Sequence, residues 1–326
     1  MKIARSATLI GLLCAGTMTL AACGGSNNSS SDSASASAGG GSGSVTVDGS
    51  STVGPLTSAA AEMFKESSPD INVTVGTSGT GGGFEKFCRG ETDMNDASRP
   101  IESDEAKACK EGGVDFQEMV VANDAITVVV NSGNDFVKCL TVDQLKKIWE
   151  PDSQVTNWNQ VDSSYPSEEI KLFGPGTDSG TFDYFTAEIN GEEGASRTDY
   201  TPSEDDNVIV TGVSGSKGGM GYFGYSYYEE NMDKVKAVEI DNGDGCVAPS
   251  AETVQDGSYA PLGRPLYIYP SIQAMKSNPA LVSFVQYYVQ NDAQIATDAQ
   301  FIPLNEEQSS KLQEQFSKAT SAAGVS

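Results

Sequence analysis

The 326-residue sequence predicts an α/β protein with parallel strands. Short apolar runs are followed by glycine-rich turns and then by helical patterns, and this order recurs along the chain. The composition, with 38% hydrophobic residues, is ordinary for a globular protein and allows a sizeable core. At about 100–200 residues per domain, the length indicates two domains.

Apolar runs bounded by turn residues predict the strands. They lie at 45–47, 71–75, 125–130, 171–173 and 265–270, and a glycine- and tyrosine-rich turn and strand are expected within 218–228. Residues 125–130 are almost continuously apolar, which indicates a strand buried on both faces.

Apolar residues at helical spacing predict the helices. They lie at 55–66, in the segment LTVDQLKKIW, and at 181–189, 279–290 and from 306 onward. The glycine run 79–83 is expected to open another helix at Phe84. Pro55 suits a first helical turn, Thr141 is the expected N-cap of its helix, and Pro151 should end that helical pattern.

Composition excludes several kinds of chemistry. The chain has no histidine, which removes Ser-His-Asp and Cys-His catalysis and imidazole metal sites. Twenty basic residues against 45 acidic ones give a net charge of −25, which argues against a nucleic-acid partner. The acidic residues are spread along the chain, as on a solvated surface.

Residues 1–22 are predicted to be a signal peptide. Lys2 and Arg5 supply its positive end, and the apolar run that follows is too short to span a membrane comfortably. The run ends in Leu-Ala-Ala-Cys, which resembles the lipobox of bacterial lipoproteins. That resemblance implies a lipid on Cys23 and an extracytoplasmic protein anchored to the cell membrane. The alternative is plain secretion with a free Cys23.

The stretch 24–44, after Cys23, is rich in Ser and Gly and has no large apolar residue. Such a segment cannot bury enough surface to order itself, so a flexible linker is expected. As a random coil, 21 residues span about 25 Å. Residues 23–44 are therefore predicted to form a lipid-anchored flexible linker between the membrane and the folded part of the protein.

Three turns have the composition of an anion site. They lie at 49–55, 77–83 and 176–181, and each follows an expected strand and opens an expected helix. Each offers hydroxyls and free backbone N–H groups at the positive end of a helix dipole. Ordinary helix capping is the alternative for any single turn. Three such turns together favour a ligand site.

The three turns, in this order, resemble those of the phosphate-binding protein of the bacterial phosphate-specific ABC transporter. So do the segments DMNDASRP, LKKIWEP, GGMGYFGYSYY and FIPL, and the resemblance covers essentially all of 45–326. It implies a two-lobed periplasmic-binding-protein fold of type II, with two α/β domains joined by a two-strand hinge. The expected lobes are 45–125 plus 265–326, and 126–264.

The resemblance also implies which residues touch phosphate. The family's ligand positions correspond to Thr52 and Val53 with Ser51 beside them, to Thr80 with Ser78 as a nearby alternative, and to Ser179, Gly180 and Thr181.

Two positions depart from the family pattern, because Ser98 replaces an Asp and Pro175 replaces an Arg. Our hypothesis is a swap in which Arg99 supplies the cation and Asp178 the acid. The acid would accept the proton that phosphate retains near neutral pH and would repel sulfate. The alternative is an Arg99–Asp178 salt bridge that does not touch the ligand.

The resemblance implies capture of inorganic phosphate and its delivery to an ABC permease with its ATPase. We expect a monomer that is not an enzyme and uses no cofactor and no metal. Alternatives are a carrier of sulfate or molybdate, a lipoprotein phosphatase and an adhesin. The Asp-Ser-Gly at 178–180 resembles an aspartic-protease motif, but a second copy is lacking.

Four cysteines remain after Cys14 in the signal peptide and Cys23. In an oxidising compartment an even number indicates disulfides, and four cysteines allow three pairings. We favour Cys88–Cys109 and Cys139–Cys246, since each pair then stays within one expected lobe.

Overall fold

The computed structural model describes residues 42–177 and 179–325. The expected signal peptide, Cys23, nearly all of the linker and Asp178 lie outside the described residues. In the part of the chain that is described, no helix is both long enough and apolar enough to cross a bilayer.

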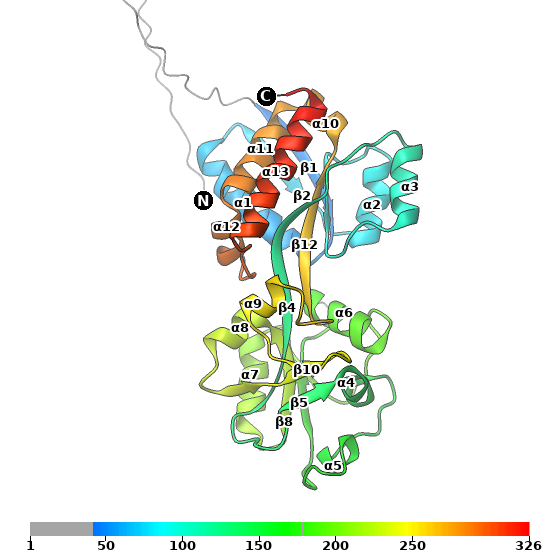
Figure 1. Ribbon diagram of the computed structural model, residues 1–326, viewed down its shortest axis with the longest axis vertical. Coiled ribbons are helices and arrows are strands. Elements are labelled where there is room, and N and C mark those ends of the chain that lie inside the picture. Colours follow the sequence, from blue (N-terminus) through cyan, green and yellow to red (C-terminus); the bar gives the residue numbers. More distant parts are fainter. Residues whose placement is uncertain (1–41, 178, 326) are drawn as a thin grey trace, which may run out of the picture. The chain divides into compact units, whose positions relative to one another are not determined.

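Strands and helices alternate along the chain (Figure 1). The strands are β1 (Gly43–Gly49), β2 (Ile71–Val75), β3 (Met94–Ala97), β4 (Met119–Asn131), β5 (Cys139–Thr141), β6 (Lys171–Gly174), β7 (Thr201–Pro202), β8 (Gly219–Gly224), β9 (Val235–Ala237), β10 (Glu239–Asp241), β11 (Cys246–Val247) and β12 (Gly263–Pro270). The helices are α1 (Val53–Ser67), α2 (Thr80–Cys88), α3 (Ser103–Glu111), α4 (Val142–Trp149), α5 (Trp158–Val161), α6 (Gly180–Phe185), the π-helix η1 (Thr186–Asn190), α7 (Asp206–Gly215), α8 (Tyr225–Glu230), α9 (Ala251–Gln255), α10 (Ile272–Ser277), α11 (Pro279–Gln290), α12 (Asp292–Asp298) and α13 (Glu306–Ala323).

The main sheet has the strand order β2-β1-β3-β12-β4-β8-β6-β7, and β9 also pairs with β4. β1 is parallel to β2 and β3, and β6 is parallel to β7 and β8. The parallel prediction holds for these strands. It is wrong for β12 and β4. β12 runs antiparallel to β3 and β4, and β4 runs antiparallel to β8 and β9, so the sheet is mixed.

The long strands β4 and β12 run side by side and connect two groups of elements (Figure 1). Their pairing extends from Gly263 opposite Ala125 to Ile268 opposite Met119. β4 contributes Val121 to one apolar core and Val128 to another. This is the α/β, two-lobed arrangement expected from the sequence, with two paired strands between the lobes.

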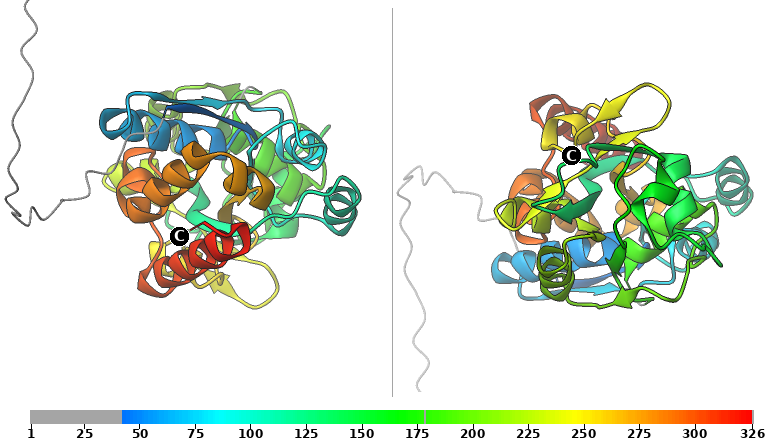
Figure 2. Two further views of the ribbon diagram at one scale, coloured as in Figure 1. Left: turned by 90° about the horizontal axis from the view of Figure 1, so that it is seen from above. Right: turned by 90° about the horizontal axis from the view of Figure 1, so that it is seen from below.

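The first large core lies under α1, α11 and α13. Leu56 of α1, Phe284 and Tyr288 of α11 and Leu312 of α13 are all buried in it. α11 and α13 lie side by side at this end of the sheet (Figures 1 and 2). The prediction of 279–290 as an amphipathic helix is confirmed with the same bounds.

The second large core is aromatic. The ring of Phe185 stacks on that of Tyr222 with centroids 3.8 Å apart, and Trp149 meets Tyr222 edge-on at 4.9 Å. Trp149 is the last residue of α4, whose predicted N-cap is confirmed. Thr141 accepts a hydrogen bond from the N–H of Gln144 in a capping box.

Three predicted elements differ in the structure. α2 begins at Thr80, so most of the glycine run lies inside the helix and does not precede it. The reason is close packing, because a Cβ on Gly83 would lie 2.5 Å from the Cα of Gly49. The segment 218–228, where we expected a turn and a strand, ends in the helix α8. The single helix predicted at 181–189 is divided into α6 and the π-helix η1 that follows it.

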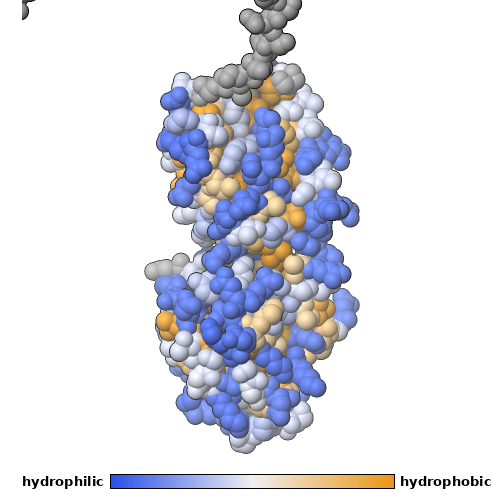
Figure 3. Space-filling view, turned by 90° about the vertical axis from the view of Figure 1, so that its left-hand side faces the viewer, coloured by the Kyte–Doolittle hydropathy of each residue, from blue (hydrophilic) through white to orange (hydrophobic). Residues whose placement is uncertain are grey.

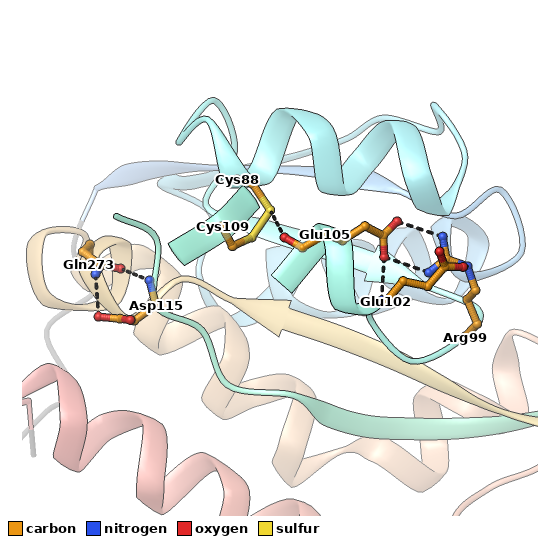
Figure 4. Close-up of a disulfide and its surroundings, with 7 residues drawn as sticks. All are labelled: Cys88, Arg99, Glu102, Glu105, Cys109, Asp115 and Gln273. Atoms are coloured by element: carbon orange, nitrogen blue, oxygen red, sulfur yellow. Dashed lines mark hydrogen bonds and ion pairs between the residues drawn. A yellow bond between two sulfur atoms is a disulfide. The ribbon is translucent and has the colours of Figure 1, made fainter. Parts of the chain in front are cut away.

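Among the described residues two disulfides are present, and they follow the pairing that we favoured from the sequence. Cys88–Cys109 joins α2 to α3, and Cys139–Cys246 joins β5 to β11. The first pair is drawn in Figure 4.

The surface agrees with the acidic composition. The face shown in Figure 3 is mainly hydrophilic, and apolar residues there stand in small groups between polar ones. Among the described residues, the large hydrophobic side chains that are exposed are Val208 and Met232.

Candidate functional site

A cavity of about 300 Å³ brings together residues that are far apart in the sequence. It is lined by Ser50, Ser51, Thr52, Gly79, Thr80, Gly81, Ser98, Arg99, Gly180, Asp183, Tyr184, Ala187, Glu188, Glu193 and Arg264. The first turn lies between β1 and α1, the second between β2 and α2, and Gly180 begins α6. All three predicted turns thus contribute to one cavity.

The first turn is shaped by the backbone of two neighbouring strands. Gly49 has a φ of 143°, and a side chain there would collide with the backbone of Asp96. The N–H of Ser50 donates to the carbonyl of Asp96 at 2.9 Å. The Ser50 hydroxyl in turn accepts from the N–H of Thr52 at 3.2 Å. This places Ser51 and Thr52 at the cavity, directly before α1.

In the second turn, Thr80 faces the cavity and Ser78 does not line it. The Thr80 hydroxyl accepts from the N–H of Ser98 at 3.2 Å and lies 3.1 Å from the Ser98 hydroxyl. In this contact one hydroxyl donates its proton to the other, so the accepting hydroxyl keeps its own proton for another partner. Gly79 and Gly81, on either side of Thr80 in the sequence, also line the cavity.

Ser78 is held by Asp48, to which it donates from both its N–H and its hydroxyl. Partial burial favours a higher pKa for Asp48, but the hydrogen bonds from Lys86 and Ser78 outweigh it and lower the pKa to about 2. Asp48 is therefore ionised at any physiological pH, and Ser78 stays bound to it.

In the third turn, Gly180 comes close to the first. A Cβ on Gly180 would lie 3.1 Å from the Thr52 hydroxyl oxygen, so glycine permits the approach. Ser179 caps α6 by accepting from the N–H of Thr181 at 3.2 Å. Asp178, the expected acid, lies outside the described residues.

The predicted ligand residues thus divide into two sets. Those that line the cavity are Ser51, Thr52, Thr80, Ser98, Arg99 and Gly180. Those described residues that do not line it are Val53, Ser78, Ser179 and Thr181. Val53 is fully buried at the start of α1.

Arg99 lines the cavity, yet its guanidinium is held by two glutamates of the adjoining helix. Its two terminal nitrogens donate to the carboxylate of Glu105, each at 2.8 Å, and its Nε lies 3.3 Å from Glu102 (Figure 4). The bond to Glu105 raises the pKa of Arg99. α3, which supplies Glu105 and Cys109, is tied to α2 by the disulfide.

Arg264 is the cation that sequence reasoning missed. It lies at the start of β12, where we expected only a crossing between lobes. Its Nη2 donates to the Thr52 hydroxyl at 3.0 Å, and its Nε and Nη2 lie 3.3 Å from Asp124 of β4. Its guanidinium carbon lies 3.4 Å from the ring centroid of Tyr184. A lone Arg at an expected hinge was the only available signal.

One side of the cavity is acidic, which the sequence analysis also did not anticipate. Asp183 of α6, Glu188 of η1 and Glu193 line it. Burial raises the pKa of Asp183, and the charge of Glu193 adds to the effect. Burial likewise raises the pKa of Glu188, while Arg264 opposes the shift.

Three hydroxyl- and glycine-rich turns around a cavity, with two strands crossing beside it, define a binding protein with two lobes. The family model of the PBP superfamily domain matches residues 34–292.

Known relatives narrow the assignment. Protein SphX of Synechocystis sp. is 48% identical over 266 residues, covering 81% of this chain and 79% of the relative. The phosphate-binding protein PstS of Staphylococcus saprophyticus is 41% identical over 309 residues, covering 93% of this chain and 92% of the relative. The chain therefore belongs to the PBP superfamily and, within it, to the family that includes SphX and PstS.

One solved structure is similar to this chain along nearly the whole length of the solved protein. It is the crystal structure of a possible phosphate binding protein from Planctomyces limnophilus, 45% identical with a TM-score of 0.81. The match covers 85% of this chain and 99% of that one.

Proposed function

We propose that this protein captures inorganic phosphate in the cavity between its lobes and delivers it to an ABC importer. Family membership supports the ligand and the transporter partner. The observation that carries the proposal is the contact of Arg264 with Thr52, which places a cation among three turns built to donate hydrogen bonds. Such an arrangement suits a small tetrahedral oxyanion.

The proposed ligand groups come from five places in the chain. The hydroxyl of Thr52 and one of the paired hydroxyls of Thr80 and Ser98 donate, with Ser51 and the backbone at Gly180 beside them. α1 and α2 direct the positive ends of their dipoles at this place. Arg264 supplies positive charge directly, and Arg99 supplies more if phosphate draws it from Glu105.

The size of the cavity favours closure on binding. The cavity volume of about 300 Å³ is more than a single five-atom oxyanion fills. The proposed lobes are 45–125 plus 265–326, and 126–264, turning about β4 and β12. The two separate apolar cores support that division, because β4 contributes Val121 to one core and Val128 to the other. Closure follows if phosphate binds the closed form more tightly.

Selectivity against sulfate is assigned to Asp178. A carboxylate accepts the proton of hydrogen phosphate, whereas it repels sulfate, which has no proton to donate. Asp178 keeps this role because the family's usual Asp is replaced by Ser98. Asp183, Glu188 and Glu193, which line the cavity, add to the negative potential there.

The rest of the assignment concerns the cell envelope. We propose a lipid on Cys23, a flexible linker over 24–44 and a monomeric body outside the membrane. The protein itself performs no reaction; hydrolysis of ATP belongs to the transporter. The absence of histidine and the family support this reading.

Calorimetric titration of the mature body, freed of endogenous ligand, tests the proposal. We expect micromolar or tighter binding of phosphate and no binding of sulfate. Asp178→Asn should admit sulfate while phosphate still binds. Sulfate binding by the unchanged protein would make it a general oxyanion carrier and contradict the role of Asp178. No binding of either ion would return the three turns to simple helix caps.

A further inference from the structure

Asp96 is a buried carboxyl group directly behind the first turn. It lies in β3, opposite Gly49 of β1 and Ile268 of β12. Its carbonyl oxygen holds the N–H of Ser50, and Ser98, two residues later, lines the cavity. Its side chain is completely buried, and within the described part of the chain neither carboxyl oxygen makes a well-formed hydrogen bond, although the Thr57 hydroxyl lies near the carboxyl group. A carboxylate without such bonds is costly in this place.

Among the residues that the structure describes, the groups that face Asp96 offer it no positive charge. Asp48 of β1 lies near Asp96, and Asp48 forms an ion pair with Lys86 of α2. α1 contributes Thr57, one turn inside the helix, and α11 contributes Tyr288, whose hydroxyl lies 3.4 Å from that of Thr57. β12 places the apolar Ile268 opposite. The surroundings therefore favour the uncharged acid.

We propose that Asp96 is a positioning residue for phosphate capture. As an uncharged acid, Asp96 keeps the N-terminal end of α1 free of negative charge, and loss of its proton weakens phosphate binding. The inference rests on the proposed function. A negative charge behind the turn would oppose both the helix dipole and Arg264, and the buried setting would screen it poorly. The acid thus links the affinity of the first turn to pH.

The direction of the pH dependence follows from burial. Burial, with the charge of Asp48 in support and Thr57 in opposition, raises the pKa of Asp96 to about 8. Below this pH the free protein is ready to bind, and above it binding requires a proton to be taken up. By reciprocity, bound phosphate should raise the pKa of Asp96 further.

The test compares phosphate dissociation constants from pH 6.5 to 9.5, at constant ionic strength, in three proteins. These are the wild type, Asp96→Asn, which cannot ionise, and the exposed control Asp70→Asn. The ionisation of phosphate itself affects all three equally. Between pH 7 and 9.5 we expect wild type and control to lose on the order of tenfold more affinity than Asp96→Asn.

Parallel curves for wild type and Asp96→Asn would overturn the inference while leaving phosphate capture intact. Failure of the wild type to bind at pH 7 would overturn the proposed function, and the inference with it. If Asp96→Asn does not fold, carbon-13 spectra of aspartate-labelled wild type decide. One carboxyl should titrate near pH 8, and phosphate should move its midpoint upward. No carboxyl titrating above pH 7 would overturn the inference.

Discussion

The guanidinium of Arg264 donates a hydrogen bond of 3.0 Å to the hydroxyl of Thr52, which lies 212 residues earlier in the chain. A hydroxyl that accepts in this way keeps its own proton for a second partner. Thr52 lines the cavity, so that proton is available to an anion there. The contact both brings a cation to the site and sets the direction in which Thr52 donates.

Replacing Arg264 should weaken phosphate binding strongly. Hydrogen bonds to charged groups contribute about 1.5–3 kcal/mol, so Arg264→Gln should raise the phosphate dissociation constant by roughly 10- to 150-fold. Arg264→Lys should recover only part of the loss, because a lysine cannot contact Thr52 and Asp124 with the same fork. Calorimetry measures both, with the exposed Arg89→Gln as the control. If the phosphate dissociation constant of Arg264→Gln differs from that of the wild type by less than twofold, Arg264 does not contribute to phosphate binding.

Arg99 provides a separate test, because its guanidinium group is already bound to the carboxylate of Glu105. If phosphate recruits this cation, Arg99→Ala should lose at least about tenfold in affinity. Glu105→Gln should bind phosphate at least as tightly as the wild type, because it removes the carboxylate that competes with phosphate for Arg99. An unchanged dissociation constant in Arg99→Ala would contradict the exchange of roles between Arg99 and Asp178. The salt-bridge interpretation would then gain support.

Gly83 should tolerate no side chain. An added Cβ would lie 2.5 Å from the Cα of Gly49 and would also collide with the side chain of Asn95. We expect Gly83→Ala to lower the free energy of unfolding by about 1–3 kcal/mol or more, as overpacked sites do. Gly215→Ala is the matched control, because nothing lies within 4 Å of its added Cβ. Urea denaturation of both variants measures the difference; equal stabilities would show that β1 and α2 can move apart freely.

The pKa of Asp96, about 8 in the folded protein, predicts a pH dependence of stability as well. An unfolded chain releases this proton near pH 4, so between pH 4 and 8 the folded state holds the extra proton and stability falls as pH rises. Asp96→Asn removes this contribution, on the order of 5 kcal/mol across the window at 1.36 kcal/mol per pKa unit. Denaturation at pH 5 and pH 8 should show wild type losing stability relative to Asp96→Asn. Equal losses would mean that the folded state ionises Asp96 normally.

Much of the fold could be predicted from local pattern. The helix at 279–290 and the N-cap at Thr141 follow from residues within a few positions, and both were correct. The start of α2 was not, because a glycine run ordinarily indicates a turn. Gly83 lies inside the helix because α2 packs against the backbone of Gly49, and this constraint comes from a residue 34 positions away.

By itself, the sequence determined an α/β protein and three turns of serine, threonine and glycine at the starts of helices, since both depend on local spacing. Only the tertiary structure decided which groups of those turns face the cavity. Ser78 is withdrawn because Asp48 of the neighbouring strand binds it, while Thr80 pairs with Ser98 at the cavity. Arg264 reaches Thr52 because β12 pairs between β3 and β4, and such pairing of distant segments leaves no trace in local spacing.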